Sequence, residues 1–258
     1  MPSSKSPENE PSRRGNADFR WAEFDPEAYF NHYYGEPHPD DDRVIECAVE
    51  AIKRASPACS DLDVVDIGTG PNLIPLFCGL PRARSLTVWE YAKSNVAWLE
   101  AELARDEMRP QWQHFWGVTR RAYGPDYALA ENPMPALRAK TRVRQGSIFD
   151  IPERAFDAAT MFFCAESITG RQDEFEAACA AFARCVEPGG TLAAAFLAHS
   201  AGYVVKGSLF PALPLSAESV ASVFAPYAGR LKTQAIGIIE QPIRSGYTGV
   251  VFLTGIAL

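Results

Sequence analysis

A glycine-rich turn, Asp66-Ile67-Gly68-Thr69-Gly70-Pro71, is the first feature of this sequence that can do chemistry. The apolar run before it, Leu62 to Ile67, predicts a short buried strand, and the segment after it predicts a helix. Glycine has no Cβ, so the backbone of the turn can approach a ligand closely. The amides at the start of the following helix also face that ligand. The turn therefore predicts a site for a nucleotide-like molecule.

The dinucleotide fingerprint of nicotinamide-cofactor enzymes is an alternative interpretation of this turn. That fingerprint has a third glycine at the position of Leu73, and Pro71 adds a rigid residue where the fingerprint tolerates few. The sequence therefore disfavours a nicotinamide cofactor, but the turn alone leaves an oxidoreductase open as an alternative.

Two further motifs fall at the ends of predicted strands. Glu90 ends the strand Ser85 to Trp89, and a carboxylate there can accept hydrogen bonds from both hydroxyls of a ribose. NAD enzymes use a similar acid, so Glu90 does not discriminate between the two cofactors. Gly146-Ser147-Ile148 follows the strand Arg142 to Gln145, and a small polar residue beside an apolar one suits an adenine ring.

The elements that position these residues alternate along the chain. Strands are predicted at 62–67, 85–89, 142–145, 156–163, 191–197, 232–239 and 249–256, and helices at 40–55, 72–79, 94–105, 173–186 and 216–227. Such alternation predicts an α/β fold, with a mostly parallel sheet and helices on both faces. Ligands of these sheets lie beyond the carboxyl ends of the strands, where the motifs above fall.

The remaining segments predict the domain organisation and the partners. Residues 1–20 are polar and predict a disordered tail, and residues 21–258 predict one domain with lid segments at 24–40, 106–140 and 198–215. A net charge of −7 without a basic cluster argues against nucleic acid. No apolar run suits a membrane span or a secretory signal, so we expect a cytoplasmic protein with a small-molecule partner. No metal is predicted, because no cluster has ligand spacing.

In this order and spacing, the turn, Glu90, the Gly146 motif and Val186-Glu187-Pro188-Gly189-Gly190 resemble the class I S-adenosylmethionine (SAM)-dependent methyltransferases, which have a Rossmann-like, seven-stranded fold. A narrower resemblance is to the nicotinamide, phenylethanolamine and indolethylamine N-methyltransferases. The segment FDPEAYFNHYY, residues 24–34, is similar to that family's FxPxxYLxxYY motif, and DIGTGP is similar to its DIGSGP. The segment from His199 to Leu215 looks like its KSSYY…FSSLPL.

The resemblance implies a cofactor site and a substrate site. The residues that it assigns to SAM, or to the product S-adenosylhomocysteine (SAH), are Tyr29, Tyr34, Gly68, Thr69, Gly70, Glu90, Tyr91, Asn95, Ser147, Ile148 and Phe162. Those that it assigns to the substrate are Phe163, Phe196, Ser200 and Tyr203. Within these sets, Tyr29 covers the methionine end and the substrate, and Tyr34 binds the methionine carboxylate.

Three departures from the family pattern bear on the substrate. Phe196 stands where the family has an Asp that binds a polar amide or amine, Ser147 replaces an Asp beside the adenine, and Phe162 replaces a Thr near the donor. These changes predict a more apolar and aromatic pocket. A flat nitrogen-containing aromatic such as an indole, or an aromatic amine, fits it better than a small polar amide, in a reaction of specialised metabolism.

Methyl transfer from a sulfonium is an in-line displacement that depends mainly on positioning. A base is needed only when a proton must leave the acceptor. The catalytic candidates are Tyr29, which covers the donor, and two bases, Glu166 and His199. Methylation of nitrogen or of carbon stays open, as does a SAM-binding protein without turnover.

Overall fold

The computed structural model describes residues 14–55, 61–237, 244 and 246–258. In this part of the chain a seven-stranded sheet has the order β3-β2-β1-β4-β5-β9-β8. Its strands are β1 (Leu62–Ile67), β2 (Ala83–Glu90), β3 (Thr141–Gln145), β4 (Phe156–Phe162), β5 (Val186–Leu197), β8 (Ala228–Gly237) and β9 (Gly249–Ala257). The first five run parallel, and β9 is antiparallel to both β5 and β8. This confirms the mostly parallel sheet predicted from the sequence.

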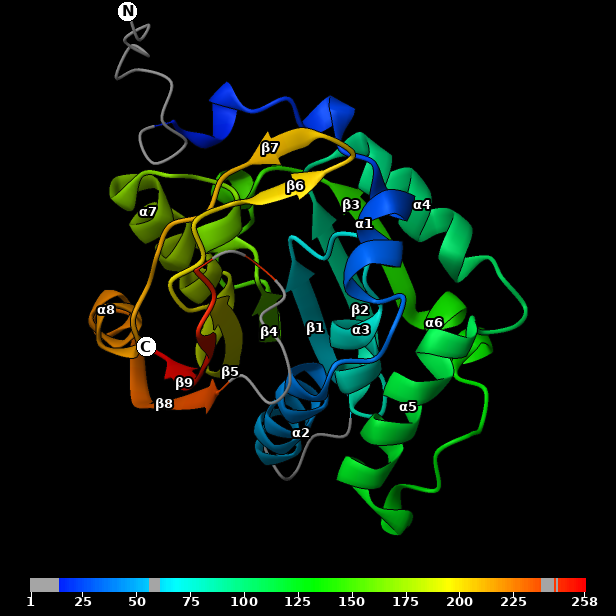
Figure 1. Cartoon of the computed structure of the whole chain (residues 1–258). Coiled ribbons are helices and arrows are strands. Elements are labelled where there is room, and N and C mark those ends of the chain that lie inside the picture. Colours follow the sequence, from blue (N-terminus) through cyan, green and yellow to red (C-terminus); the bar gives the residue numbers. More distant parts are fainter. Residues whose placement is uncertain (1–13, 56–60, 238–243, 245) are drawn as a thin grey trace, which may run out of the picture.

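Helices cover both faces of the sheet, as predicted (Figure 1). One face carries α2 (Pro39–Arg54), α3 (Ile74–Gly79), α4 (Lys93–Leu103), α5 (Pro110–Tyr123) and α6 (Met134–Lys140); the other carries α7 (Gln172–Arg184) and α8 (Ala217–Phe224). Strand side chains alternate between the two apolar cores, so Val64 packs with α2 and α3 while Val65 packs with α7.

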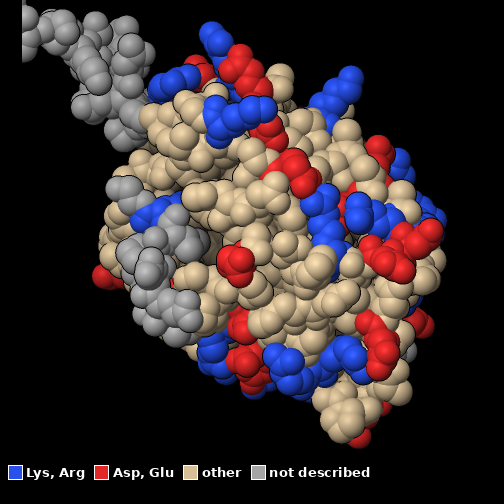
Figure 2. All heavy atoms as spheres, turned by 45° about the vertical axis from the view of Figure 1, so that its right-hand side comes forward, with Lys and Arg blue, Asp and Glu red and all other residues tan. Residues whose placement is uncertain are grey.

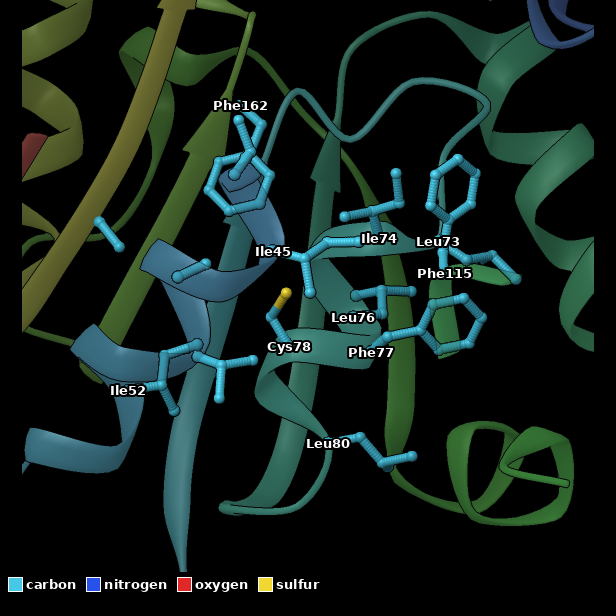
Figure 3. Packing of buried hydrophobic residues seen from close by; sticks show 14 of the residues in the cluster. Ile45, Ile52, Leu73, Ile74, Leu76, Phe77, Cys78, Leu80, Phe115 and Phe162 are labelled. Carbon is cyan, nitrogen blue, oxygen red and sulfur yellow. The ribbon is translucent and has the colours of Figure 1, made fainter. Parts of the chain in front are cut away.

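The core around α2 and α3 shows why these helices form where the sequence predicts them. Ile45 and Ile52 recur on one side of α2 at helical spacing, and both are buried. Figure 3 shows them among side chains of α3 such as Leu76 and Cys78, with Phe162 at the end of β4 above Ile45. The packing fixes α3, and therefore the turn that precedes it, against the sheet.

Part of the predicted tail and two of the predicted lid segments contain buried or regular structure. Residues 14–20 were expected in the tail, yet Phe19 is buried and the Asn16 amide donates to Glu174 Oε2 over 2.7 Å; residues 1–13 lie outside the described part. Residues 106–140 contain α5, whose Trp112 joins the core with α2 and α3. Residues 198–215 contain a hairpin of β6 (Tyr203–Val205) and β7 (Ser208–Phe210). The lid role of residues 24–40, 106–140 and 198–215 remains a prediction.

The Glu187-Pro188-Gly189-Gly190 turn differs from the sequence prediction in its detail. We expected it to separate the helix from a strand that starts at Thr191, but β5 begins at Val186. The pairing with β4 jumps from Phe156–Val186 to Ala158–Thr191, so the four residues form an irregularity within the strand. Gly189 adopts a φ of 88°, which glycine allows without strain.

The surface carries charges of both signs. On the face shown in Figure 2, Lys and Arg side chains are interspersed with Asp and Glu. Among the described residues, no helix combines the length and apolar character needed to cross a membrane. The same residues contain no group of three or more His, Cys, Asp or Glu side chains placed to hold a metal ion.

Candidate active site

A cavity of about 820 Å³, its open mouth included, lies at the carboxyl ends of β1, β2, β3 and β4. The turns after these strands form its floor, and the N-terminal segment, α1 (Pro26–Tyr33) and the β6–β7 hairpin form its outer wall. This is the edge at which open α/β sheets bind ligands.

The glycine turn after β1 is shaped by two left-handed residues. Gly68 has a φ of 66° and Gly70 a φ of 59°, a region that other residues occupy at a cost. A Cβ on Gly68 would lie 2.1 Å from Cys164 Sγ, whereas a Cβ on Gly70 would meet no atom within 4 Å. Gly68 therefore allows the close approach of two protein segments, and Gly70 leaves open space beside the cavity.

The side chain of Asp66 stabilises the turn through hydrogen bonds. Its carboxylate accepts hydrogen bonds from Thr69 Oγ1 over 2.5 Å and from Thr160 Oγ1 over 2.6 Å. Burial raises the pKa of this carboxyl to about 7, although both hydroxyls act in the opposite direction. The Thr69 hydroxyl is thus committed to Asp66, and Thr69 contributes to the cavity as part of the turn.

Glu90 lies at the end of β2, and both of its carboxylate oxygens accept hydrogen bonds from backbone amides beside the cavity. Oε2 accepts from the Gly70 amide over 2.9 Å, and Oε1 accepts from the Ala92 amide and from Asn95 Nδ2 over 2.8 and 3.2 Å. Burial raises the pKa of Glu90, and these donors oppose the rise. The buried Asn95 Oδ1 has no partner among the described residues. Two carboxylate oxygens and a free amide oxygen fit the hydroxyls of a ribose.

A slot suited to a flat ring lies beyond the carboxyl ends of β2 and β3. Ser147 and Ile148 line it, as does Trp89, whose Nε1 donates to the Ser147 carbonyl over 2.8 Å. A Cβ on Gly146 would lie 2.6 Å from the Trp89 ring, so glycine is needed there. Trp89 is not among the residues predicted for the site. Its position next to Glu90, at the end of a strand, is the signal that was available.

The outer part of the cavity is aromatic. Tyr29 packs against Tyr33 and Tyr203, with ring centroids 4.5 and 6.1 Å apart. Burial raises the pKa of Tyr29 to about 12, so its hydroxyl is neutral at ordinary pH. Tyr34 lies deeper, and its hydroxyl accepts from Asn72 Nδ2 over 3.0 Å.

More aromatic side chains complete this wall. Phe162 and Phe163 follow each other at the end of β4, and Phe163 has a φ of 57°, a strained conformation for a bulky residue. Trp21 and Phe24 come from the N-terminal segment, and the sequence analysis assigned neither to the site. The FxPxxY resemblance, which begins at Phe24, was the signal for that segment.

Four predicted site residues do not line the cavity. Phe196 is fully buried on the other face of the sheet, where it packs against Phe175 and Phe224. His199 is exposed, and its Nδ1 lies 2.8 Å from Thr248 Oγ1. Glu166 and Ser200 are buried behind the cavity.

Of these four, Glu166 is the one next to a cavity residue, Ser167. Its Oε1 accepts from the Leu197 amide over 2.9 Å, and its Oε2 has no partner among the described residues. Burial raises the pKa of Glu166 to about 7. A carboxyl with that pKa can exchange a proton at neutral pH.

Solved structures with a similar fold place this architecture in a class. They include the glycopeptide N-methyltransferase MtfA complexed with SAH, at a TM-score of 0.52 and 12% identity over 82% of this chain and 90% of that chain. They also include the Burkholderia thailandensis 1,6-didemethyltoxoflavin-N1-methyltransferase, at 0.50 and 14% over 90% and 85%, and a SAM-dependent methyltransferase of Methanosarcina mazei, at 0.52 and 12% over 77% and 94%. The fold is that of the class I SAM-dependent methyltransferases.

The family follows from the sequence. The model of the NNMT/PNMT/TEMT family matches residues 15–250, so the chain belongs to this family and is a SAM-dependent methyltransferase. No curated protein matches the chain closely enough to count as a relative. The membership confirms the resemblance drawn from the motifs, and a nicotinamide-cofactor oxidoreductase does not agree with it.

Proposed function

We propose that this enzyme methylates a small aromatic or heteroaromatic molecule that contains nitrogen, such as an indole or an aromatic amine, in specialised metabolism. The observation that carries the proposal is the continuity of two surfaces within one cavity. A polar floor suited to a nucleoside, at Glu90 and Asn95, continues into a wall of aromatic rings that includes Trp21, Phe24 and Tyr29.

The polar floor is where we place the cofactor. When bound, SAM supplies a methyl group on a positively charged sulfonium. Glu90 and Asn95 would hold its ribose, the slot at Trp89 and Ile148 would hold its adenine, and Tyr34 would face its methionine end. The orphaned Asn95 Oδ1 and the open space at Gly70 support this placement.

The aromatic wall is where we place the acceptor. Ring faces attract a cation through their quadrupole, and they offer a flat ring a large contact area. Tyr29 contacts two segments of the wall, since its ring packs on Phe24 at 5.3 Å and on Tyr203 at 6.1 Å between centroids. It would position the acceptor against the methyl group, which is the main requirement of an in-line transfer.

A base enters only if the acceptor must lose a proton. Glu166 suits this role better than His199, because Glu166 adjoins the cavity at Ser167 and its Oε2 has no partner among the residues that the structure describes. His199 lies at the exposed end of β5 and pairs with Thr248. If the acceptor is a pyridine nitrogen or a neutral amine, neither residue is required for the transfer itself.

The cofactor site is tested by Glu90→Gln. This change keeps the shape of the side chain but removes the charged carboxylate that accepts hydrogen bonds from the ribose hydroxyls, so we expect SAH to bind about 10- to 100-fold more weakly by calorimetry. Glu100→Gln, an exposed change on the neighbouring helix α4, is the matched control and should leave SAH affinity unchanged. Equal SAH affinity for the Glu90 variant and the wild type would show that the ribose assignment is wrong.

The acceptor is tested by a screen with deuterated-methyl SAM, read by mass spectrometry. The acceptors are indoles, phenylethylamines, pyridines and tryptophan-derived diketopiperazines, and we expect a labelled product from at least one. Fragmentation of the product shows whether nitrogen or carbon carries the label. Tight SAM binding without product from any of these would refute the proposed acceptor class and favour a binding protein without turnover.

A further inference from the structure

One buried cation next to the cavity has no role in the function proposed so far. Arg244 belongs to the connection that joins β8 to β9 along the chain, and it is only 7% exposed. Its guanidinium carbon lies 4.2 Å from the ring centroid of Tyr203 and 4.9 Å from that of Tyr33. The guanidinium therefore packs between the faces of two tyrosines, an arrangement that arginine favours.

The hydrogen bonds of Arg244 go to neutral groups of the cavity wall. One terminal nitrogen donates to Tyr29 Oη over 3.0 Å, and the other donates to Ser167 Oγ over 3.3 Å. Nε has no partner among the described residues. Tyr29, Ser167 and Tyr203 all line the cavity, so the guanidinium of Arg244 lies directly against the aromatic end of the cavity.

The described part of the chain supplies no counter-charge to Arg244 at bonding distance. Among the described residues, no carboxylate oxygen lies within 4.0 Å of its nitrogens in an ion pair. Glu166 attracts it through space, but burial raises the pKa of Glu166 to about 7, so that carboxyl is only partly ionised at neutral pH. A buried cation is costly without a counter-charge, and an anionic ligand group would supply one.

We propose that Arg244 binds a carboxylate on the acceptor, so that the substrate is an aromatic acid rather than a simple amine. This inference rests on the proposed function, whose aromatic end it completes. The planar fork of the guanidinium matches the geometry of a carboxylate, and both of its terminal nitrogens lie within hydrogen-bond distance of residues that line the cavity. The methionine carboxylate of the donor is the other carboxylate that enters the cavity, and the experiment separates the two.

The experiment measures binding to the enzyme loaded with SAH, so it needs no turnover. The probes are matched acid and amide pairs: indole-3-acetate with indole-3-acetamide, pyridine-3-carboxylate with its amide, and phenylacetate with phenylacetamide. We expect the wild type to bind the acid of at least one pair about 10- to 100-fold more tightly than its amide by calorimetry.

Three variants assign this preference to the residue. Arg244→Gln should bring the acid to the affinity of the amide while the Kd of SAH stays within twofold. Arg244→Lys keeps the charge without the fork and should retain part of the preference. Arg121→Gln, an exposed arginine at the end of α5, is the control and should behave as the wild type.

Unchanged SAH binding in Arg244→Gln also shows that the variant is folded. A loss of SAH affinity with the acid preference intact would assign the cation to the donor and overturn the proposal. An amide that binds the wild type as tightly as its acid, or no binding of any acid, overturns it without reference to a variant. An acid preference without any methylated product would leave the inference standing and refute the proposed function alone.

Discussion

Gly68 and Gly70 provide a matched pair of substitutions in one turn. Both residues have a left-handed backbone, so replacing either with alanine costs about 1–2 kcal/mol of stability. At Gly70 that is the whole expected cost, because the new Cβ meets no atom within 4 Å. At Gly68 the Cβ would lie 2.1 Å from Cys164 Sγ and 2.8 Å from Cys164 Cβ, which adds about 1–3 kcal/mol of overpacking.

The assay is urea denaturation of Gly68→Ala, Gly70→Ala, Cys164→Gly and the wild type, with SAH affinity measured alongside. We expect Gly68→Ala to be less stable than Gly70→Ala by about 1–3 kcal/mol. We expect Gly70→Ala to weaken SAH binding, since its methyl group occupies open space at the cavity. The double variant Gly68→Ala/Cys164→Gly removes both contacting atoms of Cys164. It should therefore lose less stability than the sum of the losses of the single variants Gly68→Ala and Cys164→Gly.

Two results would refute this reasoning. Equal stability of the two alanine variants would mean that the turn relaxes away from Cys164, so that the close approach does not require glycine at position 68. Additive losses in the double variant would show that the contact between these two residues is not the source of the cost.

Two further predictions concern stability. Asp66 has a pKa of about 7 in the folded chain and 3.8 when unperturbed. Between these values the folded state keeps a proton that the unfolded state loses. The free energy of unfolding therefore falls as the pH rises from about 4 to 7. Asp66→Asn should flatten that part of the profile in urea titrations, and an unchanged slope would contradict the assignment. Arg109 bonds Glu27 and the buried Glu102, so Arg109→Met leaves Glu102 without its close ion pair and should cost about 3 kcal/mol. The exposed Arg121→Met on α5 is the control, and a similar loss in both would count against this explanation.

The parts of the molecule that local patterns determine were predictable from the sequence. β1 has the predicted bounds, because an apolar run that ends in glycines allows little else. Glu90 lies in the cavity for a related reason, since a residue at the end of a parallel strand necessarily reaches that edge of the sheet.

Residues whose position depends on distant packing were not predictable in this way. Arg244 comes from the connection between two late strands, and only the fold brings it to Ser167 and Tyr29.

Phe196 was predicted at the substrate site, but its side chain does not line the cavity. Alternation along β5 places it on the same face as Leu192 and Ala194, away from the cavity, so the resemblance to a family Asp did not determine where its side chain lies.

The outer wall of the cavity has a small apolar core of its own. Phe24, Tyr203, Val205 and Phe210 form a cluster apart from the two large cores of the sheet, and Trp21 packs on it. The packing that shapes the aromatic end of the cavity is therefore separate from the packing that holds the sheet.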